Sequence, residues 1–175
     1  MLSAAQCGYW DKMKTCQVAM ADLRQLPSYH RQTIPDDYMD AMGHMNVCHY
    51  MAIFDRATWR LFADNGLDDA YFSTTENGVF MLKQFIQYLA EVRPGETVAV
   101  FSRIVGLTDK RIQLMHFMAN QDTNELAAII ESLITHVNLQ VRKASSLPPE
   151  IAARLGSRLE KDQHLAWEAP LSGMM

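Results

Sequence analysis

One long helical pattern at residues 47–64 constrains the fold of this chain more than any other feature. Apolar residues, together with Thr58, recur there at intervals of three and four, which is the repeat of an amphipathic helix. The stripe comprises Val47, Tyr50, Met51, Ile53, Phe54, Ala57, Thr58, Trp59, Leu61 and Phe62. A stripe this broad is typical of a helix buried against a sheet. Asn46 is a favourable N-cap and Gly66 a favourable stop, so the sequence predicts one buried helix over residues 47–64.

Extended segments lie on both sides of this helical pattern. A short alternating segment at 29–34 precedes it, and longer ones follow, separated by polar turns such as the one at 94–96. The longer segments span residues 79–92, 97–107, 111–120 and 126–141. Short turns predict an antiparallel meander, and one helix packed on one sheet predicts an α+β fold. Pro148 and Glu150 suit the start of a further helix that runs to about residue 161.

The length of 175 residues suits one domain with appendages. Residues 1–28 are expected to form an N-terminal arm, or a helix over 9–23 that Pro27 would end. Residues 29–163 hold the domain with its C-terminal helix, and residues 164–175 are expected to form a tail. A single sheet around one helix leaves an outer face and strand edges that need cover, so we expect a dimer.

Composition excludes several classes of function. Acidic residues number 20 against 16 Lys and Arg, giving a net charge of −4, so we expect no nucleic-acid partner. No apolar run approaches a bilayer span and the first residues do not resemble a signal peptide, so we expect no membrane partner and a cytoplasmic location. The three cysteines form no CxxC pair, and His44 and His49 do not share a helix face. We therefore expect no disulfide framework, no metal site and no cofactor.

The most informative polar segment is the connection at 40–46, which leads directly into the long helix. A carboxylate at Asp40 would lie near the unpaired N–H groups of the helix start, where a developing oxyanion could also bind. Asp40 could then attack an acyl carbon or activate a water molecule. Gly43 would let the backbone come close to a ligand. Spacing alone equally allows a simple loop or capping role for Asp40, because Asp is common at helix starts.

The motif Asp-Ala-Met-Gly-His-Met-Asn at 40–46, followed by Tyr50 and by Phe-Asp-Arg-Ala at 54–57, resembles the signature of the 4-hydroxybenzoyl-CoA thioesterase family. The resemblance continues through the turn at 94–96 and the segment from His136 onward, and it covers roughly residues 29–155. It implies the hotdog fold, in which a curved antiparallel sheet wraps a long central helix. The order of elements predicted above agrees with that fold.

The resemblance also implies roles for individual residues. Asp40 matches the catalytic aspartate, as nucleophile or general base, and Gly43 matches the loop glycine. Val47 matches the residue whose backbone N–H polarises the thioester carbonyl. His44 and Asn46 match the remaining polar positions of the motif and are expected to shape the site. For His44, a catalytic role and a hydrogen bond that organises the loop both stay open.

The implied activity is hydrolysis of a small acyl-CoA thioester to the free acid and CoA, at a site on the interface of a homodimer or homotetramer (a dimer of dimers). Thiolate is a good leaving group, so a positioned carboxylate and an oxyanion site are sufficient and no Ser-His-Asp triad is needed. Two alternatives stay open: an acyl-CoA hydratase or dehydratase, and a hotdog protein that binds acyl-CoA without turnover.

Some segments resemble a subset of the family that cleaves betainyl-CoA in carnitine degradation, namely residues 66–71, residues 88–92 and Glu131. A trimethylammonium group would need aromatic faces and a carboxylate. Candidates for the acyl pocket are Trp10, Tyr50, Trp59 and Tyr88. Lys83 and Phe85 depart from the pattern of this subset, and Lys83 could instead favour an anionic acyl group. Glu131 lies in a predicted strand, where it either faces solvent or is buried with a partner.

Overall fold

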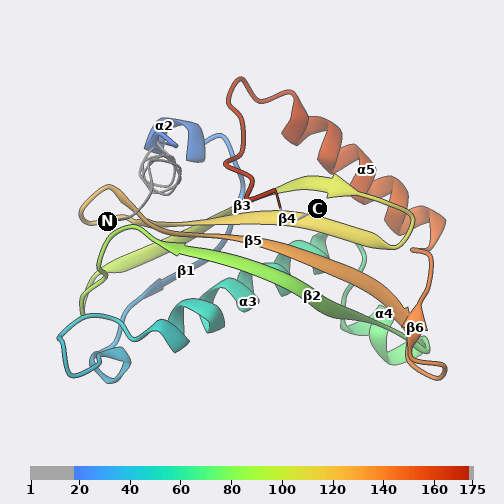
Figure 1. The fold of residues 1–175 in the computed structure, drawn as a ribbon, viewed down its shortest axis with the longest axis horizontal. Coiled ribbons are helices and arrows are strands. Elements are labelled where there is room, and N and C mark those ends of the chain that lie inside the picture. The colour runs from blue at the N-terminus through green and yellow to red at the C-terminus, as the bar shows by residue number, and fades with distance from the viewer. Residues whose placement is uncertain (1–17, 174–175) are drawn as a thin grey trace, which may run out of the picture.

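A single curved sheet wraps one long helix in the computed structural model, which describes residues 18–173 (Figure 1). The six-stranded sheet has the order β1-β3-β4-β5-β2, with β6 paired to β5. Its strands are β1 (Ser28–Thr33), β2 (Asn77–Tyr88), β3 (Thr97–Leu107), β4 (Arg111–Asn120), β5 (Glu125–Asn138) and β6 (Lys143–Ala144). All pairings are antiparallel. The architecture confirms the predicted α+β fold of one helix on one sheet.

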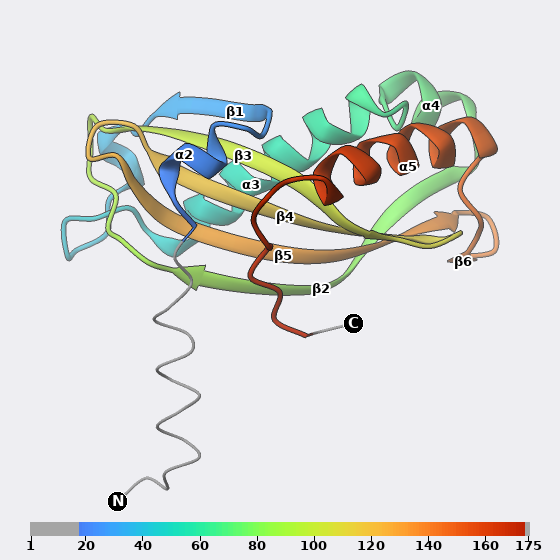
Figure 2. The same ribbon diagram turned by 90° about the horizontal axis from the view of Figure 1, so that it is seen from above.

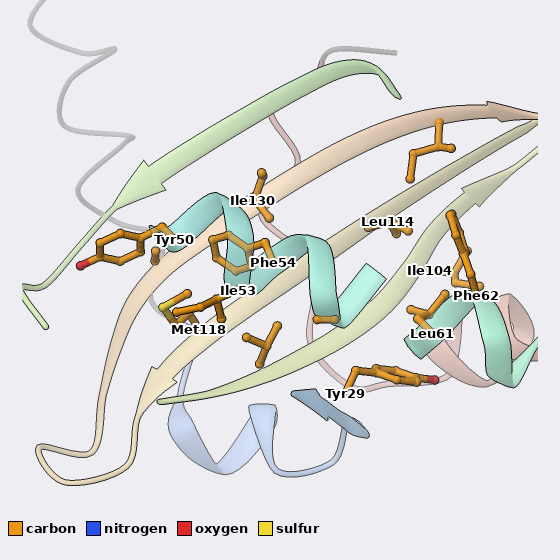
Figure 3. Packing of buried hydrophobic residues seen from close by; sticks show 14 of the residues in the cluster. Tyr29, Tyr50, Ile53, Phe54, Leu61, Phe62, Ile104, Leu114, Met118 and Ile130 are labelled. Atoms are coloured by element: carbon orange, nitrogen blue, oxygen red, sulfur yellow. The ribbon is translucent and has the colours of Figure 1, made fainter. Parts of the chain in front are cut away.

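The helix α3 (Val47–Asp64) has the predicted bounds and fills the concave side of the sheet. Tyr50, Phe54 and Leu61 are buried on its inner face. They pack with apolar side chains from β3, β4 and β5, including Ile104, Leu114, Met118 and Ile130 (Figure 3). This core fixes the axial position of α3, and with it the place where the N-terminus of the helix meets the sheet.

A second apolar cluster covers the convex face of the sheet. The short helix α2 (Met20–Leu23) contributes Leu23 to it, and the segment after α5 (Pro149–Gln163) runs back across β3, β4 and β5 (Figure 2). Trp167 in that segment packs edge-on against Phe117 at 5.6 Å between ring centroids. The described part of the predicted tail is therefore packed on the sheet.

This covering segment also explains the burial of Glu131, which is 1% exposed. The backbone N–H of Ser172 donates to Glu131 Oε2 at 2.6 Å, and Gln113 Nε2 donates to Oε1. Of the two placements open from the sequence, burial with partners is the one observed. Glu131 lies under the C-terminal segment, on the face of the sheet opposite α3.

One edge of the sheet is closed and the other is open. The first half of β3 pairs with β1, and α5 covers the second half, where the N–H of Ile104 donates to Asp162 Oδ2 at 2.8 Å. Arg158 holds that carboxylate at 2.7 Å. On the far side, β2 pairs only with β5 among the described residues. Its open edge carries the exposed side chains of Met81 and Leu82.

Several predicted bounds differ from the structure. The strand expected over 79–92 starts earlier and ends at Tyr88, because the N–H groups of Leu89 and Ala90 both turn to the carbonyl of Ala127. The strand expected over 126–141 ends at Asn138, whose side chain accepts N–H donors from the turn that follows. Strands 97–107 and 111–120 have the predicted bounds.

Short elements were missed by the sequence patterns. They are η1 (Asp36–Tyr38), β6 and α4 (Asp69–Thr74), which starts where Asp68 Oδ1 accepts the N–H of Tyr71. Of the helix expected over 9–23, most lies outside the described residues, and only α2 is seen near its end. No helix within residues 18–173 combines the length and the apolar character that crossing a bilayer requires.

Candidate functional site

The loop before α3 is a tight hairpin built around Asp40. The N–H of Asp40 donates to the carbonyl of His44, and the N–H of Gly43 donates back to the carbonyl of Asp40, both at 3.1 Å. Gly43 has φ of 82°, a left-handed conformation that L-residues with a side chain adopt at a cost. The motif spacing is therefore needed to close this loop, and Gly43 lies where the turn demands glycine.

The loop is anchored to the body of the fold at its end. Met45 is buried and its N–H donates to the carbonyl of Val92 at 2.8 Å. The N–H of Asn46 donates to the carbonyl of Tyr38 at 2.9 Å, and its side chain accepts the N–H of Cys48 at 3.1 Å. Asn46 is thus the N-cap of α3, as its position before the helical pattern indicated. These bonds hold Asp40 in place beside the start of the helix.

The two oxygens of the Asp40 carboxylate have different partners. Oδ1 accepts the N–H of Met42 at 2.8 Å, and Oδ2 lies 3.5 Å from Nδ1 of His44. The side chains of Asp40 and His44 are 25% and 33% exposed, so both are reachable from solvent. A held, partly exposed carboxylate with an imidazole beside it can act as a nucleophile or as a general base.

Val47 begins the helix and presents a backbone donor. It is the first residue of α3 and its side chain is largely exposed. The N–H groups of a first turn lack partners within the helix, and the helix dipole adds partial positive charge there. The backbone N–H of Val47 can therefore donate a hydrogen bond to a developing oxyanion. This role does not depend on the side chain of Val47.

A hollow of about 240 Å³ lies at this end of α3, between the helix start and the end of β2. Its wall is formed by His44, Met45, Val47, Tyr50, Tyr88, Leu89, Ala90 and Glu91. His44 and Val47 thus lie on the wall of the hollow, and Asp40 lies next to the wall, 3.5 Å from His44. Gly43 and Asn46 shape the loop and the helix start. Their chemical roles remain predictions.

Two of the expected pocket residues lie in this hollow. The ring centroids of Tyr50 and Tyr88 are 5.1 Å apart, with an edge-to-face angle of 84°. Trp59 lies instead in the second half of α3, where it packs against Phe72 of α4 at 5.6 Å, and it does not line the hollow. Trp10 lies outside the described residues.

Leu89, Ala90 and Glu91 belong to residues 88–92, which resemble the betainyl-CoA subset, but no role in the site was predicted for them. They were read as the end of a strand over 79–92, and a continuing strand would have carried them along the sheet edge. The sequence signal that marks them is that resemblance, because the early end of the strand has no local pattern of its own. The chain turns earlier, at Tyr88, and so brings Glu91 to the wall of the hollow.

Burial changes the titration of the two tyrosines. Desolvation raises the pKa of Tyr50 to about 12 and also raises the pKa of Tyr88 above its ordinary value. Both phenols therefore stay neutral and protonated near neutral pH. The wall of the hollow therefore contains two uncharged aromatic rings, together with the carboxylate of Glu91 and the imidazole of His44.

A second polar cluster lies in the sheet and is sealed from solvent. His116 accepts or donates hydrogen bonds with Ser102 Oγ at 2.6 Å and Thr58 Oγ1 at 2.9 Å, and all three side chains are buried. Burial lowers the pKa of His116 to about 3, so the imidazole is neutral. This cluster joins α3 to the sheet through polar contacts and offers no open surface to a substrate.

Comparison with known proteins places this chain among thioesterases. The sequence profile of the Thioesterase-like superfamily matches residues 34–155. The betainyl-CoA thioesterase of Pseudomonas aeruginosa is 26% identical over 140 residues, which cover 80% of this chain and 87% of that protein. The L-carnitine dehydrogenase/betainyl-CoA thioesterase of Agrobacterium fabrum is 29% identical over 126 residues. The match covers 72% of this chain, which spans about a quarter (26%) of that longer protein.

Solved structures give the same fold. A Staphylococcus aureus protein in complex with CoA superposes with a TM-score of 0.77 at 21% identity, covering 86% of this chain and 95% of that one. A putative thioesterase from Pseudomonas putida superposes with a TM-score of 0.71 at 28% identity, covering 86% and 94%. These likenesses confirm the predicted hotdog fold.

Proposed function

Because the chain belongs to the Thioesterase-like superfamily, we propose that it hydrolyses the thioester bond of an acyl-CoA at the Asp40 loop. The observation that carries the proposal is the placement of a fixed carboxylate at the start of α3. Asp40 lies 3.5 Å from His44, and His44 shares the wall of the hollow with Val47. A carboxylate that contacts the wall of the hollow through His44 and a helix N-terminus on that wall are the two groups that thioester hydrolysis needs.

In the proposed reaction the thioester carbonyl accepts the N–H of Val47, and the helix start stabilises the oxyanion that forms. Asp40 either attacks the carbonyl carbon, forming an anhydride that water then opens, or takes a proton from the attacking water. In both routes the C–S bond breaks, CoA leaves as a thiolate that takes up a proton, and the acyl group leaves as the free acid. His44 orients the Asp40 carboxylate.

For the acyl group we propose betainyl, so that the substrate is betainyl-CoA. The relative from Pseudomonas aeruginosa carries that substrate in its name. The hollow of about 240 Å³ has room for a small acyl group such as betainyl. The cytoplasmic location expected from the sequence stays a prediction.

For the assembly we propose a homodimer in which the β2 strands of two copies pair at their open edges. An unpaired edge with exposed Met81 and Leu82 favours addition of a strand. The hollow begins at Tyr88, at the end of the same strand, so it would lie close to the interface. The homotetramer expected as the alternative would need a further contact, and α2 and the C-terminal segment already cover the convex face.

The direct test is release of CoA thiol from a panel of acyl-CoAs, with wild type beside Asp40→Asn. The panel holds acetyl, medium-chain, aromatic, malonyl and betainyl thioesters. We expect Asp40→Asn to lose at least about 100-fold in rate, the usual size of an acid–base contribution. Asp37→Asn, an exposed carboxylate in η1, is the matched control and should keep wild-type activity.

Two results would contradict the proposal. If Asp40→Asn were as fast as wild type, hydrolysis would not occur through this loop. If no thioester released thiol while acyl-CoA still bound, the chain would be a binding protein without turnover. Formation of a hydrated or dehydrated acyl-CoA in place of thiol would favour the hydratase alternative.

A further inference from the structure

We propose that Tyr50, Tyr88 and Glu91 form a subsite that selects a small cationic acyl group, a quaternary ammonium, within the hollow. The inference rests on the proposed thioesterase function and names the side chains that set its specificity. The three residues come from different segments, with Tyr50 on α3, Tyr88 at the end of β2 and Glu91 in the turn after it.

The aromatic part is a right-angled corner. The ring centroids of the two tyrosines are 5.1 Å apart and their planes meet at 84°, so the edge of one ring lies against the face of the other. Tyr50 is only 4% exposed, whereas Tyr88 is 46% exposed. One ring is therefore held rigidly by the core, and the other is available to a ligand. Electron-rich ring faces attract quaternary ammonium groups, especially where water is excluded.

The charges around the corner favour a cation. Among the residues that form the wall, Glu91 carries the carboxylate and none is Lys or Arg. An anionic acyl group would be repelled by the Glu91 carboxylate, whereas a cation would be attracted by it.

Arg93 contacts the Glu91 carboxylate. Its Nη2 lies 3.5 Å from Glu91 Oε2, with the two side chains 68% and 62% exposed. Ion pairs this exposed are weak, because water competes for both partners. The weak pair with Arg93 therefore still allows the Glu91 carboxylate to contact a ligand. Substitution of Arg93 by Gln would remove the competing cation and should strengthen the subsite.

Lys83, which could have favoured an anionic acyl group, does not line the hollow. It precedes Tyr88 by five residues on the same extended strand, a span of roughly 16 Å at the rise of a β-strand.

The apolar part of the wall suits a small quaternary ammonium group. Met45, Leu89 and Ala90 provide apolar contacts for the methyl groups on nitrogen.

The test compares betainyl-CoA with 3,3-dimethylbutyryl-CoA, in which carbon replaces the quaternary nitrogen and only the charge differs. We expect wild type to hydrolyse betainyl-CoA at least ten times more efficiently, measured as kcat/KM. Tyr88→Leu should lower that ratio about fivefold by removing a ring face, while Tyr88→Phe should keep it. Glu91→Gln should lower the ratio and Arg93→Gln should raise it.

The same two thioesters are also compared as dissociation constants with Asp40→Asn protein, so that selectivity is measured without turnover. Equal constants, or a ratio that Tyr88→Leu leaves unchanged, would overturn the cation subsite, and hydrolysis of the neutral thioester would still support the thioesterase. Tighter binding of betainyl-CoA with no thiol release by wild type would overturn the proposed hydrolysis and keep the subsite.

Discussion

Nδ1 of His44 lies 3.5 Å from Oδ2 of Asp40, while the other carboxylate oxygen is held by the N–H of Met42. The imidazole therefore contacts the one oxygen that the loop leaves free, and it does so from the wall of the hollow. This geometry makes His44 a positioning residue for Asp40, and the first prediction follows from it.

Substitution of His44 by Ala should lower kcat about tenfold and change KM little, because Asp40 stays in the loop but loses the partner that orients it. His49→Ala is the control, since that ring stacks on Tyr38 at 3.7 Å outside the hollow and should leave kcat unchanged. Steady-state kinetics on the preferred thioester measures both. A rise in KM alone would show that His44 binds substrate and does not position Asp40.

Substitution of Gly43 by Ala should destabilise the loop. A Cβ at Gly43 meets no atom within 4 Å, so the cost is that of φ at +82°, about 1 kcal/mol. Gly156→Ala in α5 also meets no atom, has no strained φ, and should stabilise by ~1 kcal/mol. Thermal unfolding of the two variants should give shifts of opposite sign. Shifts of the same sign would show that the backbone of Gly43 is not restrained as described.

Loss of the Asn46 cap should weaken the start of α3. Asn46→Ala leaves the N–H of Cys48 without its acceptor and should cost ~1 kcal/mol in the free energy of unfolding, measured with urea. Asn46→Asp keeps an acceptor and should restore most of that loss. If Asn46→Asp were as unstable as Asn46→Ala, the role of the side chain would not be capping.

His116 should make stability depend on pH. Its pKa is about 3 in the fold against 6.5 for the ordinary value, so between these limits only the unfolded chain binds the proton. Stability conferred by neutral His116 is therefore present above pH 6.5 and is lost as pH falls. Between pH 6.5 and 5 the loss is about 2 kcal/mol. His116→Asn should show a fall smaller by that amount, and equal falls in urea unfolding would contradict the burial of a neutral imidazole.

Trp167 should contribute through its ring and not through its N–H. The guanidinium of Arg103 lies 4.6 Å from its ring centroid, while its Nε1 has no partner among the described residues. Trp167→Ala should cost about 3 kcal/mol in unfolding free energy, the lower end for loss of a large aromatic side chain. Trp167→Phe keeps the ring and removes the unpaired donor, and it should cost much less. Equal losses would place the contribution in the indole N–H.

Local sequence patterns determined those helices and strands whose apolar repeat and end signals both lie within one stretch of the chain. Helix α3 has the predicted bounds because its apolar repeat, its Asn46 cap and its Gly66 stop all lie within one stretch. Strands β3 and β4 have theirs because polar turns border them on both sides. The motif at 40–46 likewise marked the loop, since its spacing is a local property of the backbone.

Tertiary structure decided what depends on contacts between distant segments. The end of β2 at Tyr88 is set by hydrogen bonds to Ala127, which no local pattern reveals, and it is this turn that brings Glu91 to Tyr50. The burial of Glu131 depends on a C-terminal segment that has no strong repeat of its own. Periodicity shows which face of an element is apolar, but only packing shows what that face meets, because distant segments meet only in the folded chain.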